Sequence, residues 1–266
     1  MSSTWTKTRF LAALVGAALG VNAWATPVID SAVLHTRVFN DFPNSTLTTT
    51  NLYPALIEFF DGPVGPGAFA NRHNFRLSDN GGISDAVFLN GDGFIFEADV
   101  MLTGTGPVEG GLQVSPWWSQ QVDGQFNIRL NDGEVAVFGG RLPFYSFTAN
   151  HGVLYQAGTT IHQKMIYKPN GLSQADPGTI EYLYTDASGT YSSGPLAFDE
   201  GNPAEDPPYG RWGILNDARV GGFVQIMNFD QGQHSAGARF TNMVFVPEPA
   251  GLALLALAGL AVVRRR

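Results

Sequence analysis

Two carboxylates in the middle of the chain have a spacing that could support catalysis. Glu97 and Asp99 lie in the alternating segment FIFEADVML. On a strand, residues two apart share a face, with Cα atoms about 7 Å apart. Paired carboxyl groups carry out glycoside hydrolysis as acid and nucleophile or base. The polar outer face of a half-buried strand would show the same pattern, so both interpretations stay open.

Aromatic side chains form two further groups that could bind a ligand. Trp117 and Trp118 follow a proline, and Tyr209, Arg211 and Trp212 follow the acidic, proline-rich segment EGNPAEDPPY. An exposed indole offers an apolar face on which a sugar ring can stack, although large aromatic residues more often bury their area in the core. On a strand, neighbouring residues point opposite ways, so at most one of the paired tryptophans would face a given ligand.

Acidic residues in turns could hold calcium, which prefers six to eight oxygen ligands. The positions are Asp92, in the turn NGDG, and Asp199 with Glu200. Neither reproduces an EF-hand loop, and tight-turn chemistry alone accounts for the first. The five histidines show no metal-ligand spacing. No cofactor is expected, apart from a structural calcium ion.

The only local cationic cluster is Arg72-His73-Asn74-Phe75-Arg76. Together with a tyrosine, such a cluster could serve lyase chemistry on acidic glycans, where a base abstracts a proton beside a neutralised carboxylate. Clusters of this size are ordinary on protein surfaces, and the segment is expected to be a surface loop.

The elements that would carry these residues are predominantly strands. In the segment 94–102, apolar and acidic residues alternate with period two, and Asn131-Asp132-Gly133 is typical of a hairpin turn. Many short strands separated by turn residues predict a β-sandwich or barrel. The strands are expected at 112–115, 126–130, 134–138, 160–167, 179–185, 213–215, 222–229 and 238–245. Residues 45–51 are expected to be a loop or an edge strand, and residues 61–67 a loop.

Composition limits the function. Between residues 26 and 246 there are 10 basic and 22 acidic residues, so a basic footprint for nucleic acid is absent. The chain has no cysteine, which excludes cysteine nucleophiles and disulfides. A domain of this size can be stabilised by its hydrophobic core alone.

The N-terminus has the three parts of a secretory signal. Lys7 and Arg9 precede an uncharged run of 12 residues, and Ala23-Trp24-Ala25 is a small-x-small cleavage site. Cleavage is predicted after Ala25. The uncharged run is too short to span about 30 Å of hydrocarbon, which argues against an anchor.

The C-terminus has a different order of parts. The motif Pro247-Glu248-Pro249 is followed by 14 uncharged residues and then by Arg264, Arg265 and Arg266. A helix of this length reaches about 21 Å, short of a full membrane span. The arginines should stay in the cytoplasm, which places the body of the chain on the far side of the membrane. Both ends therefore predict the same topology.

This C-terminal pattern resembles the PEP-CTERM sorting signal of Gram-negative bacteria. The resemblance covers residues 246–266 and implies recognition by an exosortase, transient passage through the inner membrane, and release or attachment in the periplasm, at the outer surface or in the extracellular matrix. Proteins of this kind are associated with extracellular polysaccharide and biofilm. The predicted organisation is a signal peptide (1–25), a β-sandwich domain (26–245) and a sorting tail (246–266).

The strand rhythm, the segment 94–102 and the closing strand pair resemble the concanavalin A-like jelly roll of lectins and polysaccharide-active enzymes. Glu97-Ala98-Asp99 resembles the strand motif Glu-x-Asp-x-x-Glu of retaining glucanases, but the last acid is absent here. The leading interpretation is an exported, non-enzymatic sandwich that binds or organises extracellular polysaccharide. The alternatives are a glycan-active hydrolase or lyase, and a purely structural matrix protein.

Overall fold

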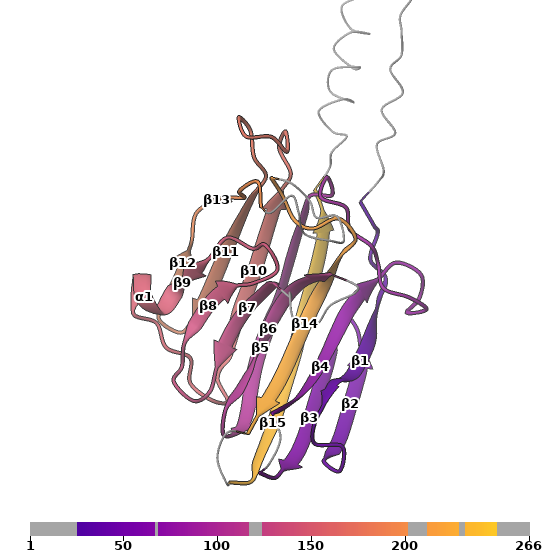
Figure 1. Cartoon of the computed structure of the whole chain (residues 1–266), viewed down its shortest axis with the longest axis vertical. Coiled ribbons are helices and arrows are strands. Elements are labelled where there is room, and N and C mark those ends of the chain that lie inside the picture. The colour runs from indigo at the N-terminus through magenta and orange to yellow at the C-terminus, as the bar shows by residue number, and fades with distance from the viewer. Residues whose placement is uncertain (1–25, 67–68, 117–123, 202–211, 229–231, 249–266) are drawn as a thin grey trace, which may run out of the picture.

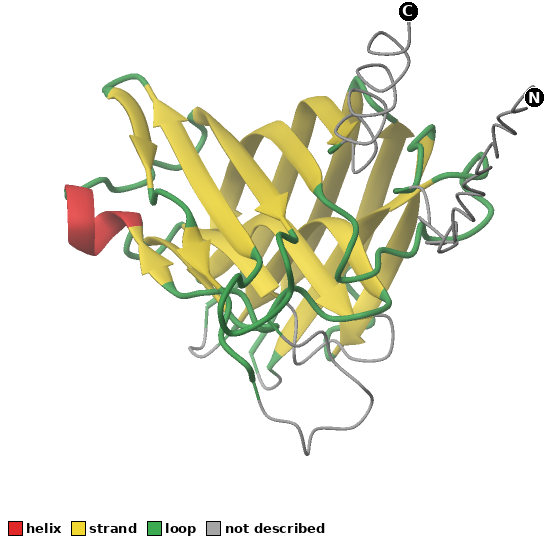
Figure 2. Cartoon of the chain, turned by 90° about the horizontal axis from the view of Figure 1, so that it is seen from above, coloured by secondary structure: helices red, strands yellow, loops and turns green. Residues whose placement is uncertain are grey.

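The computed structural model describes residues 26–66, 69–116, 124–201, 212–228 and 232–248. Within these ranges the chain forms two antiparallel sheets that face each other (Figures 1 and 2). The predicted cleavage site at Ala23 and Ala25 lies outside the described residues, and so do both flanking helices. The same holds for Pro249 and the terminal arginines.

The first sheet, sheet A, places four central strands side by side where the candidate site will be found. Its described strands are, in spatial order, β1 (Ser31–Asn40), β4 (Ala70–Ser78), β14 (Ala218–Met227), β6 (Val108–Pro116), β7 (Gly124–Arg129), β8 (Val135–Phe138) and β9 (Tyr145–Ser146). Strands β4, β14 and β6 pair in an unbroken register, with Gly221 opposite both Arg76 and Gln113. Residues whose side chains point to the same side of the sheet therefore form rows across neighbouring strands.

The second sheet, sheet B, packs against the first. Its described strands are, in spatial order, β12 (Gly189–Ser192), β11 (Thr179–Asp186), β10 (Thr160–Lys168), β5 (Phe94–Thr105), β15 (His234–Pro247), β3 (Leu56–Val64) and β2 (Thr46–Leu52), while β13 (Leu196–Ala197) pairs with β11. A short helix, α1 (Phe147–His151), begins at the N-cap Ser146 and ends at Gly152 in the left-handed conformation.

The chain crosses repeatedly between the two sheets. Strand β1 is in sheet A, β2 and β3 are in sheet B, β4 is in sheet A and β5 is in sheet B. Strands β6–β9 then return to sheet A, β10–β13 to sheet B, and β14 and β15 close one sheet each. This arrangement confirms the prediction of an all-β jelly-roll sandwich.

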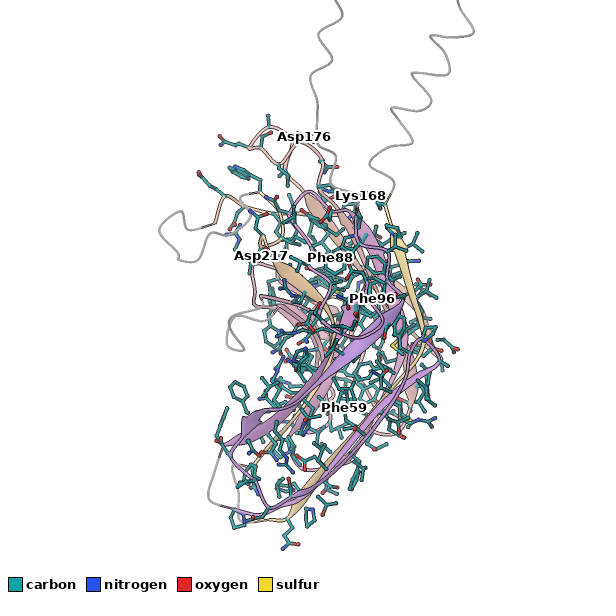
Figure 3. All side chains as sticks on the ribbon, turned by 90° about the vertical axis from the view of Figure 1, so that its right-hand side faces the viewer. Phe59, Phe88, Phe96, Lys168, Asp176 and Asp217 are labelled. Atoms are coloured by element: carbon teal, nitrogen blue, oxygen red, sulfur yellow. The ribbon has the colours of Figure 1, made fainter. Side chains whose placement is uncertain are left out.

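The core lies between the sheets and runs the length of the molecule. Phe59, Phe88 and Phe96 are each at most 1% exposed and mark its extent in Figure 3. On β5 the residues Phe94, Phe96, Ala98, Val100 and Leu102 all point into it, as period-two alternation predicted.

Most of the predicted strands are present, and the exceptions are informative. Strands β10 and β11 match their predicted segments closely, and the turn at Gly133 joins β7 to β8 as expected. Strand β2 pairs only with β3 and is an edge strand. Two predictions are wrong. Residues 213–215 are not a strand, because the amide of Ile214 bonds to the Tyr167 hydroxyl at 3.3 Å instead of to a ladder. Residues 61–64 are the end of β3, not a loop.

The segment Arg72–Arg76 was also predicted incorrectly as a surface loop. It forms the middle of β4, a strand that is buried along its entire length. Polar side chains occupy both faces of this strand, so its sequence shows no hydrophobic alternation. The arginines and Asn74 share one face, while His73 points between the sheets with Phe75.

A buried polar pair links the two sheets. The imidazole Nε2 of His73, on β4, lies 2.9 Å from Oδ2 of Asp61, on β3, and both side chains are 1% exposed. The amide of Arg37 donates to Nδ1 of His73 at 3.0 Å, so the ring proton that meets Asp61 is on Nε2. Asn71 donates to the same carboxylate oxygen at 2.7 Å.

No helix within the described ranges has the length and apolar character that a membrane crossing would require.

Candidate functional site

The outer face of sheet A carries a cluster of polar side chains where four strands lie side by side (Figure 1). Inward residues of these strands, such as Phe75, Leu112 and Val224, belong to the core. The alternate positions point away from it. We call the following set the polar face: Arg72, Asn74 and Arg76 on β4; Arg219 and Gln225 on β14; Glu109 and Gln113 on β6; and Gln125 and Asn127 on β7.

Arg72 is the centre of the polar face. Its guanidinium donates to three carboxamide oxygens, those of Asn74 at 3.1 Å, Gln225 at 3.2 Å and Gln113 at 3.0 Å. It also lies over the Phe223 ring, with Cζ 4.2 Å from the centroid. Because an arginine has donors only, it fixes the amide oxygens toward itself. The amide NH₂ groups of these residues are thereby directed away from the guanidinium.

Several atoms of the polar face have no hydrogen-bond partner among the described residues although they are buried. Four are donors and two are acceptors: Nδ2 of Asn74, Nε of Arg76, Nε2 of Gln113, Nε of Arg219, Oε1 of Gln125 and Oδ1 of Asn127. A buried unpaired polar atom costs about 1–3 kcal/mol, so native proteins keep few of them. Asn74 and Gln113 are 0% exposed and Arg76 is 7% exposed, so these atoms are covered, and their concentration on one sheet face marks a layer whose hydrogen bonds are incomplete within the described residues.

Asp85 binds three basic groups at one end of the polar face. Its Oδ1 lies 2.7 Å from Nε2 of His35, and its Oδ2 accepts from Nη1 of Arg76 at 3.1 Å. Nε of Arg219 is 3.9 Å from the same oxygen, too far for a hydrogen bond. Burial alone would raise the pKa of Asp85, but the hydrogen bonds and charges of His35 and Arg76 outweigh it and hold the pKa below its ordinary value.

The same neighbours also shift the pKa of Arg219. Burial, followed by repulsion from Arg76, lowers the pKa of Arg219, while Asp85 opposes this effect. A guanidinium remains charged at any physiological pH. Two guanidinium groups therefore share the Asp85 carboxylate at this end, and the negative charge of Asp217 also acts on Arg219.

Glu109 lies at the other end of the polar face. Its Oε2 accepts from Nδ2 of Asn127 at 3.1 Å, which leaves the Oδ1 of that asparagine directed elsewhere. Burial raises the pKa of Glu109 above its usual range, despite Asn127 and the nearby charges of Arg72 and Arg129. The polar face thus offers donors, amide acceptors and one carboxyl group that ionises less readily than usual.

The predicted carboxylate pair lies on the other sheet. Glu97 and Asp99 are on the outer face of β5, where Lys164 approaches Glu97 at 2.7 Å and His162 Nδ1 approaches Asp99 at 2.8 Å. Asn242 also donates to Asp99, at 2.8 Å. Both carboxylates are partly exposed and matched by basic neighbours across the strands, as expected of the polar outer face of a sheet.

The predicted aromatic positions are only partly within the described residues. Trp117, Trp118, Tyr209 and Arg211 lie outside them. Trp212 is described and is half-buried; its backbone nitrogen donates to the oxygen of Asp199 at 3.2 Å, and its oxygen accepts from Gly178 at 2.7 Å. In sequence, the two tryptophans directly follow β6, a strand of the polar face.

The predicted calcium ligands do not gather in one place. The Asp92 carboxylate accepts from the amide of Leu89 at 2.7 Å and closes its own turn, and burial raises its pKa. Asp199 pairs with Arg141 at 3.1 Å, with Glu200 next to it in the chain. Among the described residues, no group of three or more His, Cys, Asp or Glu side chains is placed to hold a metal ion.

Sequence reasoning identified Arg72, Asn74 and Arg76 but not the residues that surround them. Two of these residues, Gln113 and Gln225, are more than 30 residues away from β4 in the sequence, and Asp85 lies in the turn that follows β4. None of the three forms a recognisable motif. The available signal was weak: single glutamines within the otherwise apolar segments GGLQV and GFVQIM. A polar residue inside an otherwise apolar strand indicates which side of the strand points away from the core.

Comparison with known proteins found structural neighbours but no match in sequence. No protein-family model matches the chain, and no curated protein sequence does. Among solved structures, a family 7 alginate lyase with product is 10% identical over 73% of this chain and 80% of its own, with a TM-score of 0.41. Arcelin-5, a lectin-like defence protein from Phaseolus vulgaris, is 11% identical over 84% of this chain and 95% of its own (TM-score 0.37).

The seed lectin of Lotus tetragonolobus is 8% identical over 84% of this chain and 96% of its own, also with a TM-score of 0.37. Because the TM-scores are low, the fold assignment depends on the strand order of the chain itself, and the function must be argued from the polar face.

Proposed function

We propose that the polar face of sheet A binds an extracellular polysaccharide that carries acidic sugars. The observation that carries this proposal is the set of six buried polar atoms without partners on one sheet face. Sugar hydroxyls both donate and accept hydrogen bonds, so a mixture of amide donors and acceptors suits them. The two guanidinium groups beside Asp85 suit a carboxylate, which guanidinium groups bind through charge-assisted hydrogen bonds.

The test compares Arg76→Ala with Arg239→Ala in binding to alginate, polygalacturonate and neutral dextran. Arg239 is the matched control, because it is an arginine paired with a carboxylate, Glu58, on the opposite sheet. Losing a charge-assisted hydrogen bond costs about 1.5–3 kcal/mol, or roughly tenfold or more in affinity. We expect Arg76→Ala to weaken polyuronate binding by that factor, and Arg239→Ala to leave it unchanged.

Arg76→Lys guards against a trivial loss of folding. It keeps a positive charge beside Asp85 but removes the planar fork, so it should restore stability and only part of the affinity. Equal binding by the wild type and Arg76→Ala, or binding of neutral dextran alone, would overturn the proposal.

A second candidate function is the eliminative cleavage of the same polysaccharide, favoured by one observation. His35 is 34% exposed and pairs with Asp85 through Nε2, while its Nδ1 has no hydrogen-bond partner among the described residues. The carboxylate holds the ring proton on Nε2 and leaves the Nδ1 lone pair available as a base. In register, His35 lies opposite Asn74, next to the arginines that would neutralise the uronate.

This candidate predicts an unsaturated uronate product, which absorbs in the ultraviolet. We expect absorbance to rise when polyuronate is incubated with the wild type, and to stay constant with His35→Ala while binding is retained. If the wild type binds polyuronate but releases no unsaturated product, the lyase function is excluded and only the binding function stands.

We propose in addition that the protein is exported and sorted. The signal sequence before Ala25 supports secretion, and the sequence of the C-terminal tail supports recognition by an exosortase at Pro247-Glu248-Pro249. The protein would pass through the inner membrane transiently and act in the periplasm, at the outer surface or in the matrix of a Gram-negative bacterium. A polysaccharide-binding sandwich is useful in that location.

A further inference from the structure

A separate pocket lies near α1 and β12, far from the polar face in sequence. Figure 1 shows α1 and β12 at the lateral edge of the sandwich. It has a volume of about 460 Å³ and is lined by the loop after α1, the start of β10 and the hairpin between β11 and β12. None of its lining residues belongs to the polar face. Pockets of a few hundred cubic ångströms are the usual size for small ligands.

One wall of the pocket is aromatic. Tyr184 is 1% exposed at its base, and the rings of Tyr191 and His151 lie 5.2 Å apart with an interplanar angle of 43°. His151 is held from behind by the hydroxyl of Tyr145, 2.8 Å from its Nε2. These rings are therefore fixed in place before any ligand arrives, which reduces the entropy lost on binding.

The Tyr191 hydroxyl continues into a chain of hydroxyl and carboxyl groups in the pocket lining. Oδ1 of Asp186 accepts from both the amide and the hydroxyl of Ser188, the amide at 2.8 Å. The Ser188 hydroxyl has a single proton, which it gives to Asp186, so the Tyr191 hydroxyl must donate to Ser188 at 2.9 Å. Oδ2 of Asp186 has no hydrogen-bond partner in the part of the chain that the structure describes, and it remains an acceptor.

We infer that this pocket binds a neutral sugar unit. Aromatic rings offer the apolar surface on which a sugar packs its C–H groups, and a carboxylate oxygen accepts from its hydroxyls. Among the residues that the structure describes, the lining contains no lysine or arginine, and Asp186 would repel a uronate. This chemistry is opposite to that of the polar face, so the pocket is a second binding site of different specificity and does not depend on the function proposed for sheet A.

The experiment titrates the full-length protein with cellobiose, maltose, lactose, chitobiose and digalacturonate, by calorimetry and by protein NMR. We expect at least one of the four neutral disaccharides to bind and to shift the signals of Gly152 and Ser188, while digalacturonate leaves these two signals unchanged. Asp186→Asn should weaken that binding about tenfold, since a charge-assisted hydrogen bond is lost.

Two tyrosine variants separate the ring from its hydroxyl group. Tyr191→Ala should abolish binding, whereas Tyr191→Phe, which keeps the ring, should retain most of it. Thr190→Ala is the matched control, because Thr190 is exposed on the same hairpin and bonds only to Thr185. Arg76→Ala should leave the affinity for the neutral disaccharide unchanged, which distinguishes this site from the polar face.

Three results would overturn the inference: no binding of any neutral disaccharide, binding that Tyr191→Ala does not alter, or digalacturonate shifting the Gly152 and Ser188 signals. Because polyuronate binding is measured separately with Arg76→Ala, failure of either site is recognised independently of the other.

Discussion

The stability of the sandwich depends on pH through the buried carboxylate of Asp61. Burial would raise the pKa of Asp61, but the hydrogen bonds from His73 and Asn71 and the charge of His73 outweigh burial and hold the pKa below its ordinary value of 3.8. A lowered folded-state pKa stabilises the fold above the unfolded-state value. That stabilisation is lost as the pH falls below about 4 and through the folded-state pKa.

We therefore expect the free energy of unfolding to drop steeply below about pH 4. Asp61→Asn should lower stability at neutral pH by about 3 kcal/mol, because a buried pair is broken, and should flatten the acid-side slope. A residual slope would remain, because the pKa of Asp85 is lowered as well. Urea unfolding at a series of pH values measures both quantities.

The control for this prediction is Asp79→Asn, a change at an exposed aspartate. It should keep both the wild-type stability and the wild-type slope. If Asp61→Asn also keeps the wild-type slope, the ionisation of Asp61 does not contribute to acid stability.

The side chain of Gln163 bonds to two backbone groups in the other sheet. Its side chain projects from β10 across the core; Oε1 accepts from the amide of Leu112 at 2.9 Å, and Nε2 donates to the oxygen of Phe126 at 3.0 Å. Leu112 and Phe126 are partners in register on β6 and β7. The carboxamide thus satisfies one backbone donor and one backbone acceptor on facing residues of these strands.

Gln163→Leu should leave both backbone groups unpaired in the core. Each unpaired group costs about 1–3 kcal/mol, so we expect a loss of roughly 2–5 kcal/mol in the free energy of unfolding. Gln174→Leu, at an exposed loop position, should change it by less than about 0.5 kcal/mol. Equal midpoints for the two variants in urea unfolding would contradict this role of Gln163.

At the scale of the element, the strands that could be predicted were those with a regular alternation of apolar and polar residues. Strands with one apolar and one polar face, such as β5 and β10, were predicted correctly because their alternation is visible in sequence. Strand β4 was missed because its outer face is polar yet buried, and its inner face contains His73. The polar face could be predicted only through its arginines. Its glutamines come from distant strands, and only the register brings them together.

Strand β14 approaches β4 closely enough to exclude a side chain. A Cβ atom at Gly221 would lie 1.9 Å from the backbone oxygen of Phe75. Gly221→Ala should therefore force the strands apart and cost about 1–3 kcal/mol, with weaker polyuronate binding because Arg76 and Gln113 flank this position. Gly91→Ala, where the space is open, is the control and should be nearly neutral. Calorimetric melting of both variants tests the difference.

On the scale of the whole molecule, the fold is completed by its last strand. Strand β15 lies between β5 and β3, in the interior of sheet B, and ends at Pro247 opposite Phe94. The amide of Glu248 still donates to the oxygen of Gly93 at 2.8 Å. Sheet B therefore forms only when the chain is present up to the beginning of the Pro-Glu-Pro motif. Removal of the residues beyond this point would leave every described strand intact.

This arrangement makes export and processing testable together. We expect the protein isolated from its cells to begin at Thr26 and to lack Arg264–Arg266, because cleavage is predicted after Ala25 and the sorting motif lies where the last strand ends. Ala25→Phe should block the first cut and leave the signal attached, whereas Val28→Phe, at an exposed position nearby, should not. Intact-mass spectrometry of the secreted and membrane fractions measures both ends.

A cytosolic protein that retains both Met1 and Arg266 would contradict export. If Thr26 is the first residue but the arginines are retained, the signal peptide is confirmed and sorting by the tail is not.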